Sequence, residues 1–188
     1  AVFWFAGDQR RLLRSMERRR CAPVPAAAAP SAPFRLFIRQ RPLSAAERRE
    51  GEYSVVEVSR GGRGVLCHKG MLSRTGKRLN ISHIEHLFDR CFPGSAGQSE
   101  VADVCIDPLL DHVLGASKEA EGQRRSTLLL FGQTGTGKTY TLSGALGRVV
   151  SRISDAIATG QRRPAAHIDS INIKFFEIHG KKAYDLLS

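Results

Sequence analysis

The sequence predicts an α/β fold in which a mixed central sheet lies between helices. An apolar run at 127–131 is followed by a glycine-rich loop, and then by apolar residues with a helical period over 137–160. A continuous apolar run is typical of a strand that helices cover on both faces. With 41% hydrophobic and 25% charged residues, the composition is that of an ordinary globular domain. At about 150 residues per domain, the 188 residues predict one domain with extra segments.

The first 33 residues differ from the rest and are predicted to form a basic, proline- and alanine-rich flexible segment. Residues 10–20 carry six arginines against Glu17 alone, and prolines follow at 23, 25, 30 and 33. Proline fixes φ and removes a hydrogen-bond donor, which favours an extended linker. The arginine run is interpreted as a solvated, partly helical tail or as an electrostatic tether to an acidic surface. The folded unit is therefore predicted to span residues 34–188.

The first half of this unit predicts short strands around one brief helix. Strand patterns, rich in β-branched and aromatic residues, occur at 34–40, 53–58, 65–68 and 88–92. Ser44 and Glu47 have the spacing of a capping box, which predicts a short helix or a loop. A glycine cluster predicts a turn between the second and third strands, which would form a small hairpin beside the main sheet. The polar and basic residues 69–78 predict a loop.

The second half alternates helices with apolar strands. Residues 100–114 predict an amphipathic helix, which Pro108 kinks or divides into two. The apolar run described above provides a strand that leads into the glycine-rich loop. The other predicted elements are a loop at 115–126, a helix at 137–160, a long alternating strand at 168–178 and a last short element at 183–187.

The loop after the apolar run matches the phosphate-binding pattern G-x-x-x-x-G-K-[ST]. Its residues are Gly132, Gln133, Thr134, Gly135, Thr136, Gly137, Lys138 and Thr139. Glycines let the backbone wrap closely round a phosphate, so that successive N–H groups and the N-terminus of the next helix face the anion. Lys138 is expected to reach the β- and γ-phosphates, and the Thr139 hydroxyl to ligate Mg²⁺. The pattern therefore predicts binding of ATP or GTP.

Several motifs together resemble the N-terminal half of a kinesin motor domain. They occur in the family's order and span about residues 34–188. The first are the R-x-R-P strand end at 39–43, the FDxVF-like segment at 88–92 and the helix start with Gln98 and Val101. The others are the YGQTGxGKTxTM-like loop at 131–142 and the FEIYxxxxxDLL-like pair at 176–179 and 184–187. The resemblance implies a P-loop NTPase fold of the kinesin type, incomplete at its C-terminus. It also implies an ATPase that moves on, or remodels, microtubules, and it looks most like the internal-motor (depolymerising) branch.

The resemblance further implies a base-binding side to the nucleotide site. Four residues would border the adenine of ATP or ADP, namely Arg39, Arg41, Pro42 and Tyr140. A guanidinium and a tyrosine ring can sandwich a base. The family's switch I (NxxSSRSH) and switch II (DLAGSE) motifs do not occur in the 188 residues, so no catalytic residue is identified. We expect part of a cytoplasmic motor that acts on the cytoskeleton, with hydrolysis performed by the intact protein.

The net charge of +11 predicts an acidic partner. Residues 60–78 hold six basic and no acidic residues, and are interpreted as a solvated loop or as a surface that faces acidic tubulin in microtubules. Nucleic acid is not expected, since aromatic residues are only 7% and no RNA-binding motif occurs. No apolar run approaches the roughly 20 residues that span a membrane. Two other functions stay open, a non-catalytic tubulin- or partner-binding module derived from a motor, and an unrelated P-loop NTPase.

Two smaller sets of residues predict structural roles. The cysteines at 21, 67, 91 and 105 fit no zinc spacing and are expected to be free thiols in a reducing compartment. His83 and His86 have helical spacing, and are interpreted as part of a helix face in preference to a metal site, because no third ligand lies nearby in the sequence.

Overall fold

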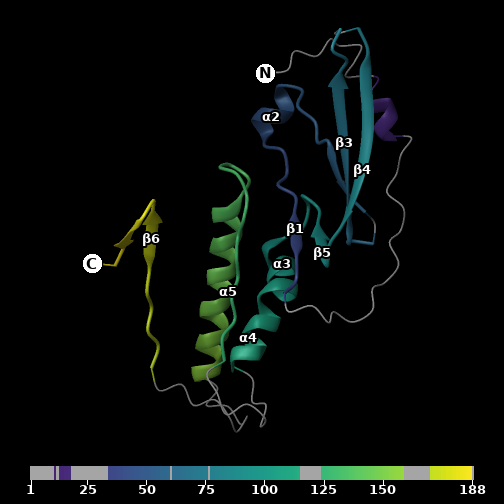
Figure 1. Cartoon of the computed structure of the whole chain (residues 1–188). Helices are drawn as coiled ribbons and strands as arrows, with labels where there is room; N and C mark the ends of the chain where they lie inside the picture. Colours follow the sequence, from purple (N-terminus) through teal and green to yellow (C-terminus); the bar gives the residue numbers. More distant parts are fainter. Residues whose placement is uncertain are drawn as a thin grey trace.

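The computed structural model describes residues 11, 13–17, 34–59, 61–75, 77–114, 124–158 and 170–187 (Figure 1). Its labelled helices are α2 (Ala45–Arg49), α3 (Gln98–Cys105), α4 (Asp107–Leu114) and α5 (Lys138–Ala158). Its strands are β1 (Phe37–Arg39), β2 (Val56–Val58), β3 (Gly64–Leu72), β4 (Leu79–Leu87), β5 (Arg90–Phe92), β6 (Phe176–His179) and β7 (Lys182–Asp185). The structure thus has the mixed α/β class that the sequence predicts.

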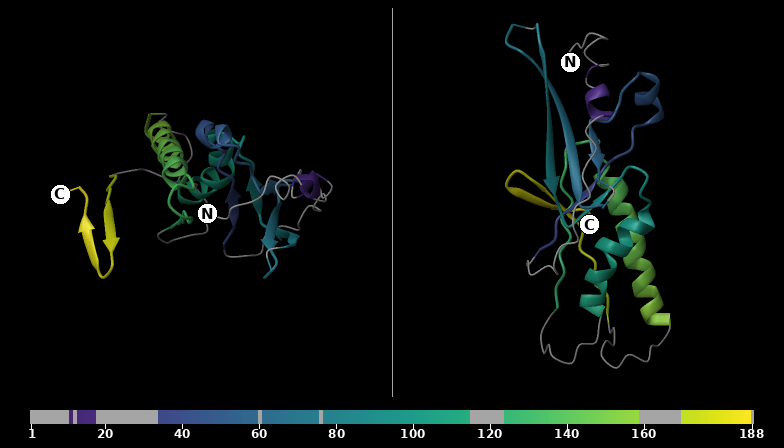
Figure 2. Two further views of the ribbon diagram at one scale, coloured as in Figure 1. Left: turned by 90° about the horizontal axis from the view of Figure 1, so that it is seen from above. Right: turned by 90° about the vertical axis from the view of Figure 1, so that its right-hand side faces the viewer.

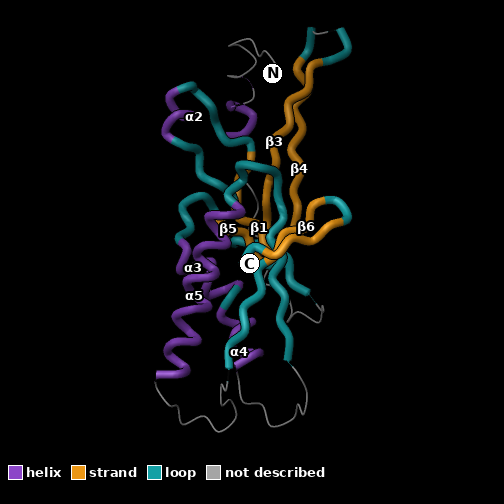
Figure 3. Tube along the Cα trace, turned by 90° about the vertical axis from the view of Figure 1, so that its left-hand side faces the viewer, coloured by secondary structure: helices purple, strands orange, loops and turns teal. Residues whose placement is uncertain are grey.

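The described strands are distributed over three small sheets. β1 and β5 pair in parallel, β2, β3 and β4 form an antiparallel sheet in that order, and β6 and β7 form a hairpin. β3 and β4 pair along their whole length, from Gly64 with Leu87 to Leu72 with Leu79. This long hairpin projects away from α3, α4 and α5 (Figure 3). The β6–β7 hairpin lies on the opposite side of α5 from the other sheets (Figure 2).

Two local signals in the sequence determine where helices begin. The Ser44 hydroxyl accepts a hydrogen bond from the Glu47 amide at 3.2 Å, and the Glu47 carboxylate accepts one from the Ser44 amide at 2.6 Å, which confirms the predicted capping box at α2. α3 ends at Cys105 and α4 begins at Asp107, so the predicted helix is divided in two. Pro108 lies in the first turn of α4, where a missing N–H costs no hydrogen bond.

The hydrophobic core lies where α3 and α5 pack next to β5. Its buried side chains are Phe92, Ala96, Val101, Ala102, Cys105, Ile106 and Ala145.

Ion pairs join the same helices at their surface. Arg148 of α5 pairs with Asp103 of α3 and, at 3.7 Å from its Nε, with Asp107 of α4, and Arg152 pairs with Asp111. The helix that follows the glycine-rich loop is therefore held against α3 and α4.

Two strand predictions in the second half differ from the structure. Residues 127–131 are described as loop, and the predicted strand there is wrong. The side chains of Leu129 and Phe131 are 83% and 97% exposed. Of the predicted strand at 168–178, Phe176–His179 is a strand and 170–175 are loop. An apolar pattern indicates a surface that can be buried, but it does not supply the neighbouring strand that must pair with it.

In the first half, the strands of the long hairpin extend further than the sequence predicts. Residues 69–72 belong to β3, so the predicted loop at 69–78 is wrong over its first part and shrinks to the turn after Leu72. His83 and His86 lie on β4, so their assignment to a helix face is also wrong. On a strand, residues three positions apart point to opposite faces. Backbone pairing between β3 and β4 holds this hairpin together. The polarity of the side chains does not predict that pairing.

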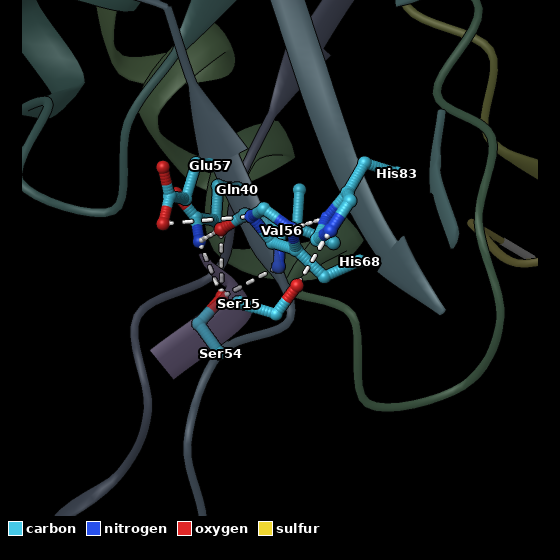
Figure 4. Close-up of polar contacts among 7 residues, drawn as sticks. All are labelled: Ser15, Gln40, Ser54, Val56, Glu57, His68 and His83. Carbon is cyan, nitrogen blue, oxygen red and sulfur yellow. Dashed lines mark hydrogen bonds and ion pairs between the residues drawn. The ribbon is translucent and has the colours of Figure 1, made fainter. Parts of the chain in front are cut away.

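A row of polar side chains joins the β2–β3–β4 sheet to residues 13–17, which are helical (Figure 4). Nδ1 of His68 lies 2.7 Å from Nδ1 of His83, and Nε2 of His83 lies 2.9 Å from the Ser15 hydroxyl. On the other side, Nε2 of His68 lies 3.5 Å from Oε1 of Glu57. The His68 side chain is fully buried. The other residues of the predicted N-terminal segment, 1–10, 12 and 18–33, lie outside the described residues, and its flexibility stays a prediction.

Replacing His83 with alanine is expected to destabilise the protein by about 1–3 kcal/mol, because the buried Nδ1 of His68 loses its hydrogen-bond partner. His86→Ala is the matched control, since His86 is exposed on the same strand and is expected to change stability by less than about 0.5 kcal/mol. Urea unfolding followed by circular dichroism measures both. Equal midpoints for the two variants would contradict the interpretation.

Candidate functional site

The glycine-rich loop predicted to bind phosphate lies directly before α5. Residues 132–137 form a turn that ends at Lys138, the first residue of the helix. Gly135 and Gly137 have φ angles of +81° and +94°, which side chains other than glycine rarely adopt. Within the turn, the Thr136 hydroxyl donates a hydrogen bond to the Gln133 carbonyl at 2.7 Å. The loop therefore bends directly before a helix N-terminus, which is the kind of position at which proteins bind anions.

The Lys138 side chain folds back over this loop. Its Nζ donates hydrogen bonds to the carbonyl oxygens of Gly132 at 2.8 Å and Gln133 at 2.7 Å. A mobile ammonium group with three donors can exchange such carbonyl partners for phosphate oxygens, which carry full negative charge. Thr139 follows in the first turn of α5 and is exposed, so its hydroxyl lies on the same end of the helix. Lys138 and Thr139 thus lie next to each other at the N-terminus of α5, beside the glycine-rich loop.

Arg39 and Tyr140, two of the residues predicted to border a base, lie together near the loop. The Arg39 guanidinium lies over the Tyr140 ring, 5.0 Å from its centroid. The two groups stack directly on each other, so the structure shows a platform and not two walls with a gap between them. The Tyr140 residue is 61% exposed. An aromatic ring backed by a cation and open to solvent can stack on a planar base.

The two other residues predicted on the base side, Arg41 and Pro42, follow β1 and are exposed. Arg41 lies close to Gly137. A Cβ added to that glycine would be 3.9 Å from the Cγ of Arg41. The Arg41 guanidinium is paired with Glu47, with Nη2 2.5 Å from Oε1. Pro42 packs beside Gly94. Arg41 therefore lies near the loop, but its charge is partly neutralised by α2.

The contact with Arg41 lowers the pKa of the Glu47 carboxyl to about 2, and hydrogen bonds from Ser44 add to the effect. The folded pKa lies below the ordinary 4.5, so the stabilisation from this carboxylate is present above pH 4.5 and is lost as the pH falls toward 2. Carbon NMR of the Glu47 carboxyl is expected to give a midpoint near 2, which moves up toward 4.5 in Arg41→Ala.

Arg48→Ala is the control for this titration, because Arg48 donates to the Leu43 carbonyl at 2.6 Å. In that variant the Glu47 midpoint is expected to stay near its low value. A midpoint that Arg41→Ala leaves unchanged would show that Arg41 is not the cause of the low pKa.

Contacts that the sequence does not predict hold the base side together. Gln98 marks a helix start in the resemblance, and the structure shows that its amide contacts both β1 and α5. Thr141 donates to the Gly137 carbonyl at 3.2 Å and accepts from Nη1 of Arg39 at 3.0 Å. The only signal for these roles in the sequence is position, since Thr141 lies one turn into the helix and Gln98 lies at the start of α3. Spacing in the sequence does not show contacts between elements.

Other predicted features of the chain do not add to this site. Cys67, Cys91 and Cys105 are free thiols, as expected, and Cys21 lies outside the described residues. Burial raises the pKa of the Cys105 thiol to about 11. Among the described residues, no cluster of three or more metal-binding side chains is found, and no helix has the length and apolar character to cross a membrane.

The basic residues predicted to meet an acidic partner lie on the long hairpin. Four of them, Lys69, Arg74, Lys77 and Arg78, are exposed near its tip. Met71 beside them is 54% exposed. The hairpin thus presents a surface with positive charge and some apolar area, and it projects away from α3, α4 and α5 (Figure 3).

Comparison with known proteins gives consistent matches. A family model described as the kinesin motor domain matches residues 39–188. Diatom spindle kinesin-1 of Cylindrotheca fusiformis is 29% identical over 154 residues, which are 81% of this chain and 22% of that protein. Kinesin-like protein KIN-8A of Arabidopsis thaliana is 30% identical over 157 residues, 81% of this chain and 21% of that protein. The chain therefore spans about a fifth of the length of these relatives.

Proposed function

Because this chain belongs to the kinesin motor domain family, we propose that it is the ATP-binding portion of a kinesin-like, microtubule-based motor. The observation that carries the proposal is the loop at 132–137, which bends through Gly135 and Gly137 and ends at Lys138 on the N-terminus of α5. In the intact protein, ATP hydrolysis drives movement along microtubules or their depolymerisation. The place of action is the cytoplasm, on the cytoskeleton.

The residues present fit the phosphates of ATP or ADP and a Mg²⁺ ion. The loop amides and the N-terminus of α5 favour an anion at this position. Lys138 already reaches over the loop, and needs only to exchange the carbonyls of Gly132 and Gln133 for phosphate oxygens. The Thr139 hydroxyl is the proposed ligand for Mg²⁺. When bound, Mg²⁺ supplies neutralisation of charge on the β- and γ-phosphate oxygens.

The base of the nucleotide is proposed to stack on the Tyr140 ring. Arg39 covers one side of that ring, and the exposure of Tyr140 leaves room for a planar group on it. Arg41 and Pro42 are proposed to border the same base. The chain binds and orients the nucleotide in this proposal, while the switch I and switch II motifs that act on the γ-phosphate in the family are not among the 188 residues.

Microtubule contact is proposed through the exposed tip of the β3–β4 hairpin. Its lysines and arginines complement an acidic surface such as that of tubulin, and the attraction is expected to weaken as salt screens it. Replacing Arg74, Lys77 and Arg78 with glutamate reverses the charge of the tip. The same change at Arg48, Arg49 and Lys174 is the control, since these residues are exposed elsewhere.

Co-sedimentation with microtubules at several salt concentrations, with and without Mg·ATP, tests the proposal. We expect salt-sensitive pelleting that depends on the nucleotide and that the tip variant reduces more than the control. Pelleting that ignores the nucleotide would indicate a non-catalytic tubulin-binding module instead. Binding of Mg·ATP without pelleting would indicate a P-loop NTPase with another partner.

A further inference from the structure

The side-chain amide of Gln98 joins three elements on the base side of the proposed site. Gln98 begins α3, and its Oε1 accepts a hydrogen bond from Nη1 of Arg39 on β1 at 2.8 Å. Its Nε2 donates to the carbonyl oxygen of Tyr140 on α5 at 2.5 Å. Arg39 can only donate and a carbonyl can only accept, so a single orientation of the amide satisfies both contacts.

A glycine on α5 provides the space in which this amide lies. A Cβ added to Gly144 would lie 2.6 Å from both Cδ and Oε1 of Gln98, closer than real contacts allow. Gly147, one turn further along the same helix, has nothing within 4 Å of such a Cβ. Glycine in a helix interior is unfavourable relative to alanine, so the close approach gives Gly144 a packing reason to be there.

The contacts of Gln98 bear directly on the platform formed by Arg39 and Tyr140. The Arg39 guanidinium is held by Gln98, by the Thr141 hydroxyl at 3.0 Å and by the Ala96 carbonyl at 3.3 Å. In this position the guanidinium lies over the Tyr140 ring. Gln98 also donates a hydrogen bond to the backbone carbonyl of Tyr140. One amide therefore contacts both residues of the stacked pair.

We infer that Gln98 is a positioning residue for the base of the nucleotide, because it fixes the Arg39 guanidinium against the Tyr140 ring and so orients the ring surface on which a purine stacks. The inference rests on the proposed nucleotide binding. It assigns to Gln98 an effect on the base and none on the phosphates, which the loop and Lys138 hold. Base and phosphate binding can therefore be separated by experiment.

The test compares Mg·ATP with Mg·tripolyphosphate, which has the phosphates without the base, by isothermal titration calorimetry. In Gln98→Ala the Kd for Mg·ATP is expected to rise about tenfold, within the range that one base–aromatic stack contributes, while the Kd for tripolyphosphate is unchanged. Gly144→Ala is expected to give the same pattern because it displaces the amide. Gly147→Ala, the matched control, is expected to change neither Kd.

Gln98→Glu provides a second measurement if Gln98→Ala fails to fold. A carboxylate still accepts from Arg39 but no longer donates to the Tyr140 carbonyl, so base binding is expected to recover only in part relative to Gln98→Ala. One outcome overturns this inference alone. In it the wild-type protein binds both ligands, and the Gln98 and Gly144 variants either keep both Kd values or weaken the binding of both ligands equally. Wild-type protein that binds neither ligand overturns the proposed function and the inference with it.

Discussion

Replacing Lys138 with alanine is expected to abolish measurable binding of Mg·ATP. Nζ of Lys138 is the cation that reaches over the phosphate-binding loop, within 2.8 Å of the Gly132 carbonyl and 2.7 Å of the Gln133 carbonyl. Two charge-assisted hydrogen bonds to phosphate contribute about 3 kcal/mol or more, so the affinity falls at least about a hundredfold. Isothermal titration calorimetry with Mg·ATP measures the loss.

Lys174→Ala is the control for this variant, since Lys174 is an exposed lysine in the loop before β6. It removes the same charge and is expected to leave the Kd for Mg·ATP unchanged. Circular dichroism of both variants checks that the fold is retained. Tight binding of Mg·ATP by Lys138→Ala would show that the loop at 132–137 does not hold phosphates in the way proposed.

Replacing Phe92 with alanine is expected to remove a large fraction of the free energy of unfolding of the protein. Phe92 is 0% exposed and belongs to the buried cluster that includes Val101, Cys105 and Ala145. Truncating a buried phenylalanine costs about 3–5 kcal/mol, through lost burial and the cavity that remains. That is a large fraction of the roughly 5–15 kcal/mol by which ordinary domains are stable.

Urea unfolding compares Phe92→Ala with Phe34→Ala, whose side chain is on a residue that is 66% exposed. The exposed control is expected to change the free energy of unfolding by less than about 0.5 kcal/mol. Similar midpoints for the two variants would mean that β5 does not pack into the core between α3 and α5. Loss of Mg·ATP binding in Phe92→Ala is expected to accompany its unfolding.

Local patterns in the sequence predict the local parts of this structure. The helical period over 137–160 predicts α5 to within a few residues, and the Ser44–Glu47 spacing predicts the N-terminus of α2. Both signals arise from residues within one or two turns of each other. The signal for the glycine-rich loop is equally local, since Gly135 and Gly137 have the positive φ angles that glycine favours and Lys138 follows directly.

Predictions that depend on partners far along the chain fare less well. The run at 127–131 has the composition of a buried strand, but the structure leaves Leu129 exposed and unpaired as a strand. β4 carries two histidines at helical spacing, and only its register with β3 reveals a strand. The position of the Arg39 guanidinium also depends on distant partners, because it donates to Gln98, Thr141 and the Ala96 carbonyl. These contacts join residues 57 to 102 positions apart, which no local pattern encodes.

The row of side chains from Glu57 to Ser15 has a direction. Only one hydrogen fits between the two Nδ1 atoms of His68 and His83. A hydrogen on Nε2 of His68 would face the Glu57 carboxylate at 3.5 Å, an ion-pair distance at which the described residues form no hydrogen bond, and it would leave Nδ1 to accept from the His83 Nδ1–H. Nε2 of His83 is then bare and accepts from the Ser15 hydroxyl. In that arrangement every hydrogen of the row points toward β2, so the tautomer of one ring constrains the tautomer of the other and the orientation of the Ser15 hydroxyl.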